Sequence, residues 1–119
     1  MRVAIASLCV GDTYQGPWKR YSARSWEDYA ARHGYSLVMF ERVLDPSPRG
    51  KARSPAWQKC LILNQPELRN FDRVVWVDSD IVINRSAPPI IEGVPVAKIG
   101  AVISGDYLHP DMRSIYLAR

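Results

Sequence analysis

Two aspartates, Asp78 and Asp80, lie one residue apart directly after the apolar run Val74–Val77. In extended backbone, residues two apart point to the same side, so both carboxylates can reach one ion. Hard divalent cations such as Mg²⁺ and Mn²⁺ prefer oxygen ligands, and commonly use one or two carboxylates together with substrate phosphates. The pair therefore indicates a metal-bridged diphosphate. The alternative is a strand-end turn in which the aspartates accept hydrogen bonds from backbone N–H groups, and spacing alone does not separate the two.

Basic side chains are the second kind of residue that could bind phosphate. The densest group is Arg49, Lys51 and Arg53, which suffices for a phosphate group or two, a solvated loop being the alternative. The remaining basic residues are scattered along a chain with 16 lysines and arginines, 12 aspartates and glutamates, and a formal net charge of +4. Proteins that bind nucleic acid gather such charge on one face or stripe, so no nucleic-acid partner is expected.

Apolar runs alternate with helical patterns, and these elements must position the charged residues. Val3–Val10 is short, apolar and closed by Gly11, which predicts a central strand buried on both faces. Further strands are predicted over Leu37–Phe40, Val74–Val77 and Val96–Ile103, with helices over Pro17–His33 and from Pro55 onward. This alternation predicts an α/β fold with a mostly parallel sheet, whose ligand crevice lies at the carboxyl ends of the strands. Residues 7–13 and 78–80 should both lie there.

The predicted helices have defined ends and inner faces. Pro17 suits the first position of one helix and Gly34 the residue after its end, while Ser54 suits the cap before Pro55 in the next. Asp45–Arg53 should be a loop, and Pro66 should interrupt the second helix. The residues expected on the inner faces, as packing rather than as a sugar-stacking platform, are Trp18, Tyr21, Trp26, Tyr29 and Ala30, then Trp57, Cys60, Leu61 and Leu68.

Composition limits the class of protein. A length of 119 residues predicts a single domain over 1–119, and the 47% hydrophobic and 24% charged residues exclude disordered, collagen-like and disulfide-scaffold classes. Cys9 and Cys60 lack a framework spacing, which predicts two buried thiols in a reducing compartment. The chain shows no signal-peptide pattern and no run of about 20 apolar residues, so a cytoplasmic location without a transmembrane segment is expected.

Three stretches of the chain resemble a known family. Ser54–Lys59 (SPAWQK) and Phe71–Ile83 (FDRVVWVDSDIVI) resemble the core signature of the galactosyl-, mannosyl- and xylosyltransferase family, which has the GT-A fold. Ser25–Tyr35 resembles that family's first helix leading into its second strand. The resemblance covers about residues 3–83 in matching order. The combination of Trp-x-Lys with Trp-x-Asp-Ser-Asp is far more specific than an isolated Asp-x-Asp.

The resemblance implies a Rossmann-like GT-A nucleotide-binding half and a nucleotide-sugar-dependent glycosyltransferase. Asp78 and Asp80 would bind Mn²⁺ or Mg²⁺ and, through the ion, the diphosphate of a UDP- or GDP-sugar. For Lys59, an exposed helix lysine is the alternative to a diphosphate contact. The full set of implied cofactor-binding residues is Ser7, Asp12, Arg53, Lys59 and Ser79.

The chain also departs from the family's pattern. Family members extend well beyond this length, and their second half supplies acceptor-binding residues and often a further metal ligand. The chain is therefore expected to be a donor-binding half that lacks the C-terminal acceptor half, with the glycan or other acceptor unidentified. His109 is the candidate for the further ligand, a structural or solvated histidine being the alternative, and Asp106 is expected in an ordinary strand-end turn.

Two other functions remain open at this point. A catalytically inert nucleotide-binding or assembly module would keep the donor half without turnover, and an unfinished sheet would favour a homo-oligomer. A haloacid-dehalogenase-like phosphohydrolase also places an Asp-x-Asp after an apolar strand and uses the first aspartate as nucleophile. That motif lies on the first strand and continues into Gly-Thr or a similar turn, whereas Ile81–Ile83 follow here.

Overall fold

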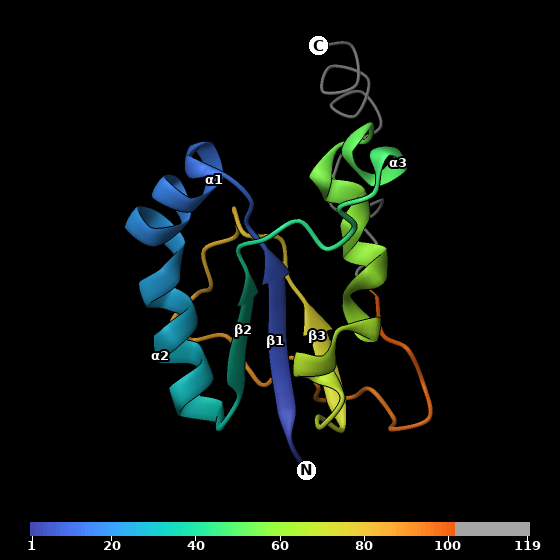
Figure 1. Ribbon diagram of the computed structural model, residues 1–119. Coiled ribbons are helices and arrows are strands. Elements are labelled where there is room, and N and C mark those ends of the chain that lie inside the picture. The colour runs from blue at the N-terminus through green and yellow to red at the C-terminus, as the bar shows by residue number, and fades with distance from the viewer. Residues whose placement is uncertain (102–119) are drawn as a thin grey trace, which may run out of the picture.

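The computed structural model describes residues 1–101, in which helices lie on both sides of a parallel sheet (Figure 1). Val3–Leu8 forms the first strand, and short linkers join most of the later elements. In chain order they are β1 (Val3–Leu8), α1 (Asp12–Pro17), the π-helical turn η1 (Trp18–Ser22), α2 (Ala23–His33), β2 (Ser36–Phe40), α3 (Pro48–Lys51), the 3₁₀ helix η2 (Pro55–Asn64), the 3₁₀ turn η3 (Pro66–Leu68) and β3 (Arg73–Trp76). This mixture of helices with a parallel sheet confirms the predicted α/β class.

The sheet has three strands in the order β2-β1-β3, and both pairings are parallel. Ala4 of β1 lies opposite Ser36 on one side and Val74 on the other, which confirms that the first strand is central. The chain passes from β1 outward to β2 and then returns across the sheet to β3. Because the direction of the strand order reverses between β1 and β3, the carboxyl ends of these two strands form the crevice that such sheets use for ligands.

Side chains of β1 alternate between two hydrophobic cores. Ala4 and Ala6 face η2 and η3 and pack with Phe40, Ile62 and Leu68. Ile5 faces the other way and packs with Trp26 and Tyr29 of α2. Nearly every side chain of β1 is fully buried, because helices cover both faces of the central strand.

The first helical region begins earlier than predicted. Helix α1 starts at Asp12, after Gly11 in a positive-φ conformation (85°), so Pro17 is its last residue rather than the first of a helix. The π-helical turn that follows inserts an extra residue into the helical spacing. This places Ser22 and Trp26 on the inner face, and the prediction that Tyr21 is buried is wrong. The end at Gly34, in the left-handed conformation (φ 68°), is confirmed.

The helix predicted after Ser54 is a 3₁₀ helix with a different inner face. The Ser54 side chain accepts a hydrogen bond from the Ala56 N–H at 3.4 Å, which confirms the cap. In a helix with three residues per turn, positions three apart share a side, and Trp57, Cys60 and Leu63 all lie on the exposed side. The predicted burial of Trp57 and Cys60 is therefore wrong. Pro66 interrupts the helix as predicted.

Two further boundaries differ from the sequence prediction. The predicted loop over 45–53 contains the short helix α3, which begins after Ser47 because the serine hydroxyl accepts a hydrogen bond from the Gly50 N–H at 3.1 Å. Residues 96–101 of the predicted fourth strand are not in a strand, and 102–103 lie outside the described residues. Within residues 1–101, no helix has the length and apolar character needed to cross a bilayer.

Candidate functional site

A cavity of about 220 Å³ lies beyond the carboxyl ends of β1 and β3. It is lined by residues that follow these strands and by the first turns of η2. The predicted site residues that it brings together are Lys59, Asp78, Ser79 and Asp80. The position agrees with the expectation that both strand ends meet at one crevice, since Leu8 and Val10 line the same cavity as the aspartates.

Asp78 is held by the geometry of the strand end. Trp76 packs on the η2 side of the sheet, and its Nε1 donates a hydrogen bond to Oδ1 of Asp78 at 2.8 Å. The turn that follows is closed by the backbone, with the Ile81 N–H donating to the Asp78 carbonyl at 3.1 Å. Among residues 1–101, neither aspartate carboxylate accepts a hydrogen bond from a backbone N–H. The geometry thus disfavours the alternative in which both carboxylates serve the turn, and within the described residues Oδ2 of Asp78 and both oxygens of Asp80 remain available to a ligand.

Lys59 reaches the cavity because η2 is fixed from its inner side. The neighbouring Gln58 is buried, and its Oε1 accepts hydrogen bonds from the N–H groups of Leu44 (2.5 Å) and Asp45 (3.1 Å). This amide satisfies two backbone donors of the preceding loop, which accounts for a polar residue on the inner face. With Gln58 turned inward, Lys59 is exposed and lines the cavity beside Ser54.

Three of the predicted binding residues do not line this cavity. Ser7 is fully buried in β1, and its hydroxyl has no hydrogen-bond partner among the described residues. Asp12 is the exposed first residue of α1, and Arg53 is exposed in the linker before Ser54. Asp106 and His109 lie outside the described residues.

A buried thiol lies directly behind the aspartate loop. Cys9 is 1% exposed at the end of β1, and its backbone N–H donates to the Phe40 carbonyl at 2.8 Å. Burial raises the pKa of the Cys9 thiol, and a side-chain hydrogen bond with Ser79 lowers it in part. The thiol is therefore neutral, and its contact with Ser79 places it beside the Asp78–Asp80 loop.

The segment that leaves the aspartate loop is fastened to α2. The Trp26 Nε1 donates to the Ile81 carbonyl at 2.8 Å, and the Ile83 N–H donates to the Ser25 hydroxyl at 3.0 Å. Farther along, the Tyr29 hydroxyl donates to the Pro88 carbonyl and accepts from the Ile90 N–H, both at 2.8 Å. Figure 1 shows this segment passing from β3 behind the sheet to α2. Side chains of α2 thus fix the backbone one residue after Asp80.

Several residues of the site were not predicted from the sequence. Tyr14 of α1 lines the cavity, and its ring is 64% exposed. Its place depends on the early start of α1, for which Gly11 itself was the available signal, since glycine readily adopts the positive φ found there. The hydrogen bond from Trp76 to Asp78 joins residues two apart in extended backbone, so the period of two could have indicated it.

The donor set suits a hard cation that keeps part of its coordination for other ligands. Asp78 and Asp80 supply carboxylate oxygens, and within residues 1–101 no group of three or more His, Cys, Asp or Glu side chains is close enough to hold a metal alone. Mg²⁺ is commonly bound through one or two carboxylates plus phosphate oxygens and water.

Comparisons of the chain with models of protein families, with curated proteins and with solved structures found no match.

Proposed function

We propose that the chain is the donor-binding part of a metal-dependent glycosyltransferase, a GT-A-type unit that binds a nucleotide-diphosphate sugar. The observation that carries the proposal is that two carboxylates and one ammonium group line a single cavity at the point where the strand order reverses. Two acidic groups beside one basic group suit a divalent cation bridged to an anionic ligand. The resemblance of the residues 54–59 and 71–83 to the family signature agrees with this assignment.

The charged side chains that line the cavity would each contribute to donor binding. Asp78 and Asp80 would hold Mn²⁺ or Mg²⁺, and such an ion neutralises the charge that develops on a departing nucleoside diphosphate. Lys59 would donate hydrogen bonds to the diphosphate from the η2 side. The cavity, at about 220 Å³, is smaller than the about 300–1,000 Å³ usual for a site that encloses a drug-sized ligand. It therefore suits the metal and diphosphate, with the nucleoside across the rim that Tyr14 forms.

The test is a thermal-shift measurement on the 119-residue chain with UDP, GDP and their sugars, with and without Mn²⁺. A ligand that binds only the folded state at 100 times its Kd adds about 2.7 kcal/mol to the free energy of unfolding. We expect a stabilisation that needs both nucleotide and metal, and that Asp78→Asn or Asp80→Asn abolishes.

The matched control is Glu27→Gln, which removes the same charge from an exposed position of α2. The proposal fails if both aspartate variants respond to metal and nucleotide as the native chain does, or if the stabilisation needs no metal. Release of nucleoside diphosphate from the donor then separates a transferase from a module that only binds it.

A further inference from the structure

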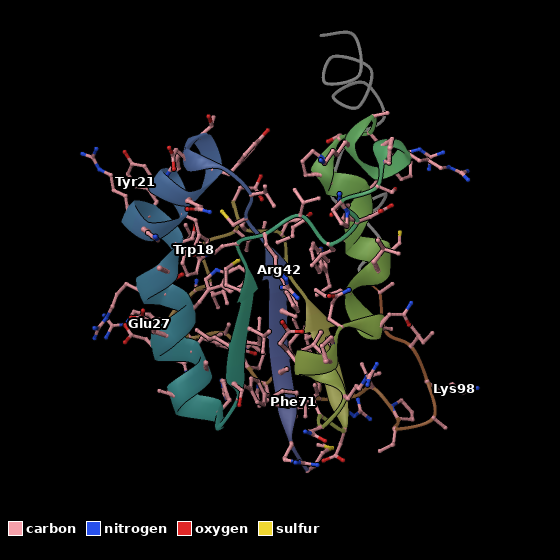
Figure 2. All side chains as sticks on the ribbon, in the orientation of Figure 1. Trp18, Tyr21, Glu27, Arg42, Phe71 and Lys98 are labelled. Atoms are coloured by element: carbon pink, nitrogen blue, oxygen red, sulfur yellow. The ribbon has the colours of Figure 1, made fainter. Side chains whose placement is uncertain are left out.

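A second cavity, of about 620 Å³, lies on α2 where the segment after β3 crosses it. None of its lining residues belongs to the first cavity, although Ile83 and Arg85 follow Asp80 closely in the sequence. Figure 2 shows Tyr21, one of its lining residues, on the outer side of the helical layer. The charged residues that line it are Arg24, Asp28, Arg32 and Arg85. We call this surface the arginine groove.

One arginine of the groove is neutralised by the single acidic residue. Nε of Arg24 donates to Oδ2 of Asp28 at 3.2 Å, and its Nη2 lies 3.0 Å from Oδ1. This two-point contact between residues four apart on α2 joins one guanidinium to one carboxylate. Two positive charges, those of Arg32 and Arg85, are left in the groove.

Arg32 is held in place without losing its charge. Its Nη2 donates to the Ala87 carbonyl at 3.3 Å, its Nη1 donates to the Arg85 carbonyl, and its guanidinium lies 5.5 Å from the centre of the Tyr29 ring. The carbonyls are neutral acceptors, so they orient the guanidinium and do not cancel it. An anion that binds here meets a cation whose side-chain freedom is already restricted, which lowers the entropic cost of binding.

Arg85 supplies the second charge at a fixed point of the backbone. Its carbonyl is bonded by Arg32, whereas among residues 1–101 its guanidinium makes no hydrogen bond or ion pair. The chain therefore presents a free guanidinium beside a restrained one, across a groove with tyrosine in its walls. Planar guanidinium groups match the oxygens of phosphate with two parallel hydrogen bonds.

We infer that the arginine groove binds a phosphate monoester. The charge balance selects this class, because a phosphate monoester carries about −1.5 to −2 at neutral pH and a single carboxylate only −1. Two unneutralised guanidinium groups match the dianion. This site needs no divalent cation, and it is independent of the function proposed for the first cavity.

The experiment follows backbone amide resonances of the 119-residue chain during titration with phenyl phosphate in the presence of EDTA, which removes metal-dependent binding at the aspartates. We expect resonances of residues 24–32 and 83–87 to move together. Arg85→Ala should weaken the binding at least fivefold, while its backbone carbonyl stays available to Arg32. Arg69→Ala is the matched control, because it removes one exposed arginine that follows η3 and is not part of the groove.

A second arm identifies the source of the phosphate. Sedimentation with phosphatidylcholine vesicles that contain phosphatidic acid measures binding to a lipid headgroup, and phenyl phosphate measures binding to a free ester. Binding in either arm that is weakened at least fivefold in Arg85→Ala and kept in Arg69→Ala supports the inference and assigns the source. Equal losses in the two variants, resonance changes confined to other residues, or no binding in either arm overturn it.

Discussion

Removing the hydroxyl of Tyr29 tests how the segment after the aspartate loop is held. The ring is 3% exposed in the core between α2 and the sheet, and Tyr29→Phe leaves this ring in place. The substitution deletes both hydrogen bonds of the hydroxyl, the one donated to the Pro88 carbonyl and the one accepted from the Ile90 N–H. The two backbone groups then lose their partner.

The size of the effect follows from these two bonds. An intramolecular hydrogen bond contributes about 0.5–1.5 kcal/mol net, so their loss should lower the free energy of unfolding by about 1–3 kcal/mol. A folded domain has about 5–15 kcal/mol in total. Each kcal/mol lost should lower the melting temperature by about 4 °C in a domain of 119 residues.

Urea unfolding followed by far-UV circular dichroism measures this change. The matched control is Tyr21→Phe, because Tyr21 is 63% exposed and its hydroxyl has no hydrogen bond among the described residues. We expect the control to lie within about 0.5 kcal/mol of the native chain, as surface substitutions usually do. If Tyr29→Phe is no less stable than Tyr21→Phe, the segment is not fastened by this hydroxyl, and the anchoring described here is refuted.

Three further predictions concern the first cavity and the two cysteines. Trp76→Phe removes the hydrogen bond to Asp78 and should weaken Mn²⁺-dependent nucleotide binding about fivefold, the equivalent of about 1 kcal/mol; calorimetric titration measures it against Trp57→Phe, whose ring is 66% exposed, and equal affinities would contradict the positioning role. Exposed Cys60 should react with a thiol reagent before Cys9, whose pKa burial raises. Because the unfolded thiol loses its proton first, the stability that Cys9 contributes should fall as pH rises past the ordinary thiol pKa, which urea titrations at several pH values check in Cys60→Ser; an unchanged or rising stability would argue against this.

Local chemistry explains which elements were predicted correctly. Gly34 was assigned to the end of α2 because only a residue without a Cβ adopts the left-handed conformation at low cost, and its φ of 68° agrees. Ser54 before Pro55 was assigned as a cap because both preferences act within one turn. The apolar run Val3–Val10 predicts a central strand because it has no polar face.

Errors occurred where packing selects between helices of different pitch. The residue types at Trp57, Cys60 and Leu63 do not indicate a helix with three residues per turn. The assumption of α-helical spacing therefore placed Trp57 and Cys60 in the core, whereas both are exposed. The choice depends on Gln58, whose amide is needed inward by the N–H groups of Leu44 and Asp45. In the same way, the π-helical turn before α2 exchanges Tyr21 for Ser22 on the inner face.

The sequence by itself determined the positions of β1, β2 and β3 along the chain and the acidic pair after β3, because apolar runs and charge are local properties. Tertiary structure alone decided which basic residues accompany that pair. Lys59 lines the cavity and Arg53 does not, although both were predicted diphosphate contacts. The groove that joins Arg32 to Arg85 likewise arises only when the segment after β3 folds back over α2. The physical reason is that long-range hydrogen bonds fix which residues become neighbours in these cavities. The bond from the Trp26 side chain to the Ile81 carbonyl, for example, joins residues more than 50 positions apart in the sequence. No local sequence pattern indicates such a contact.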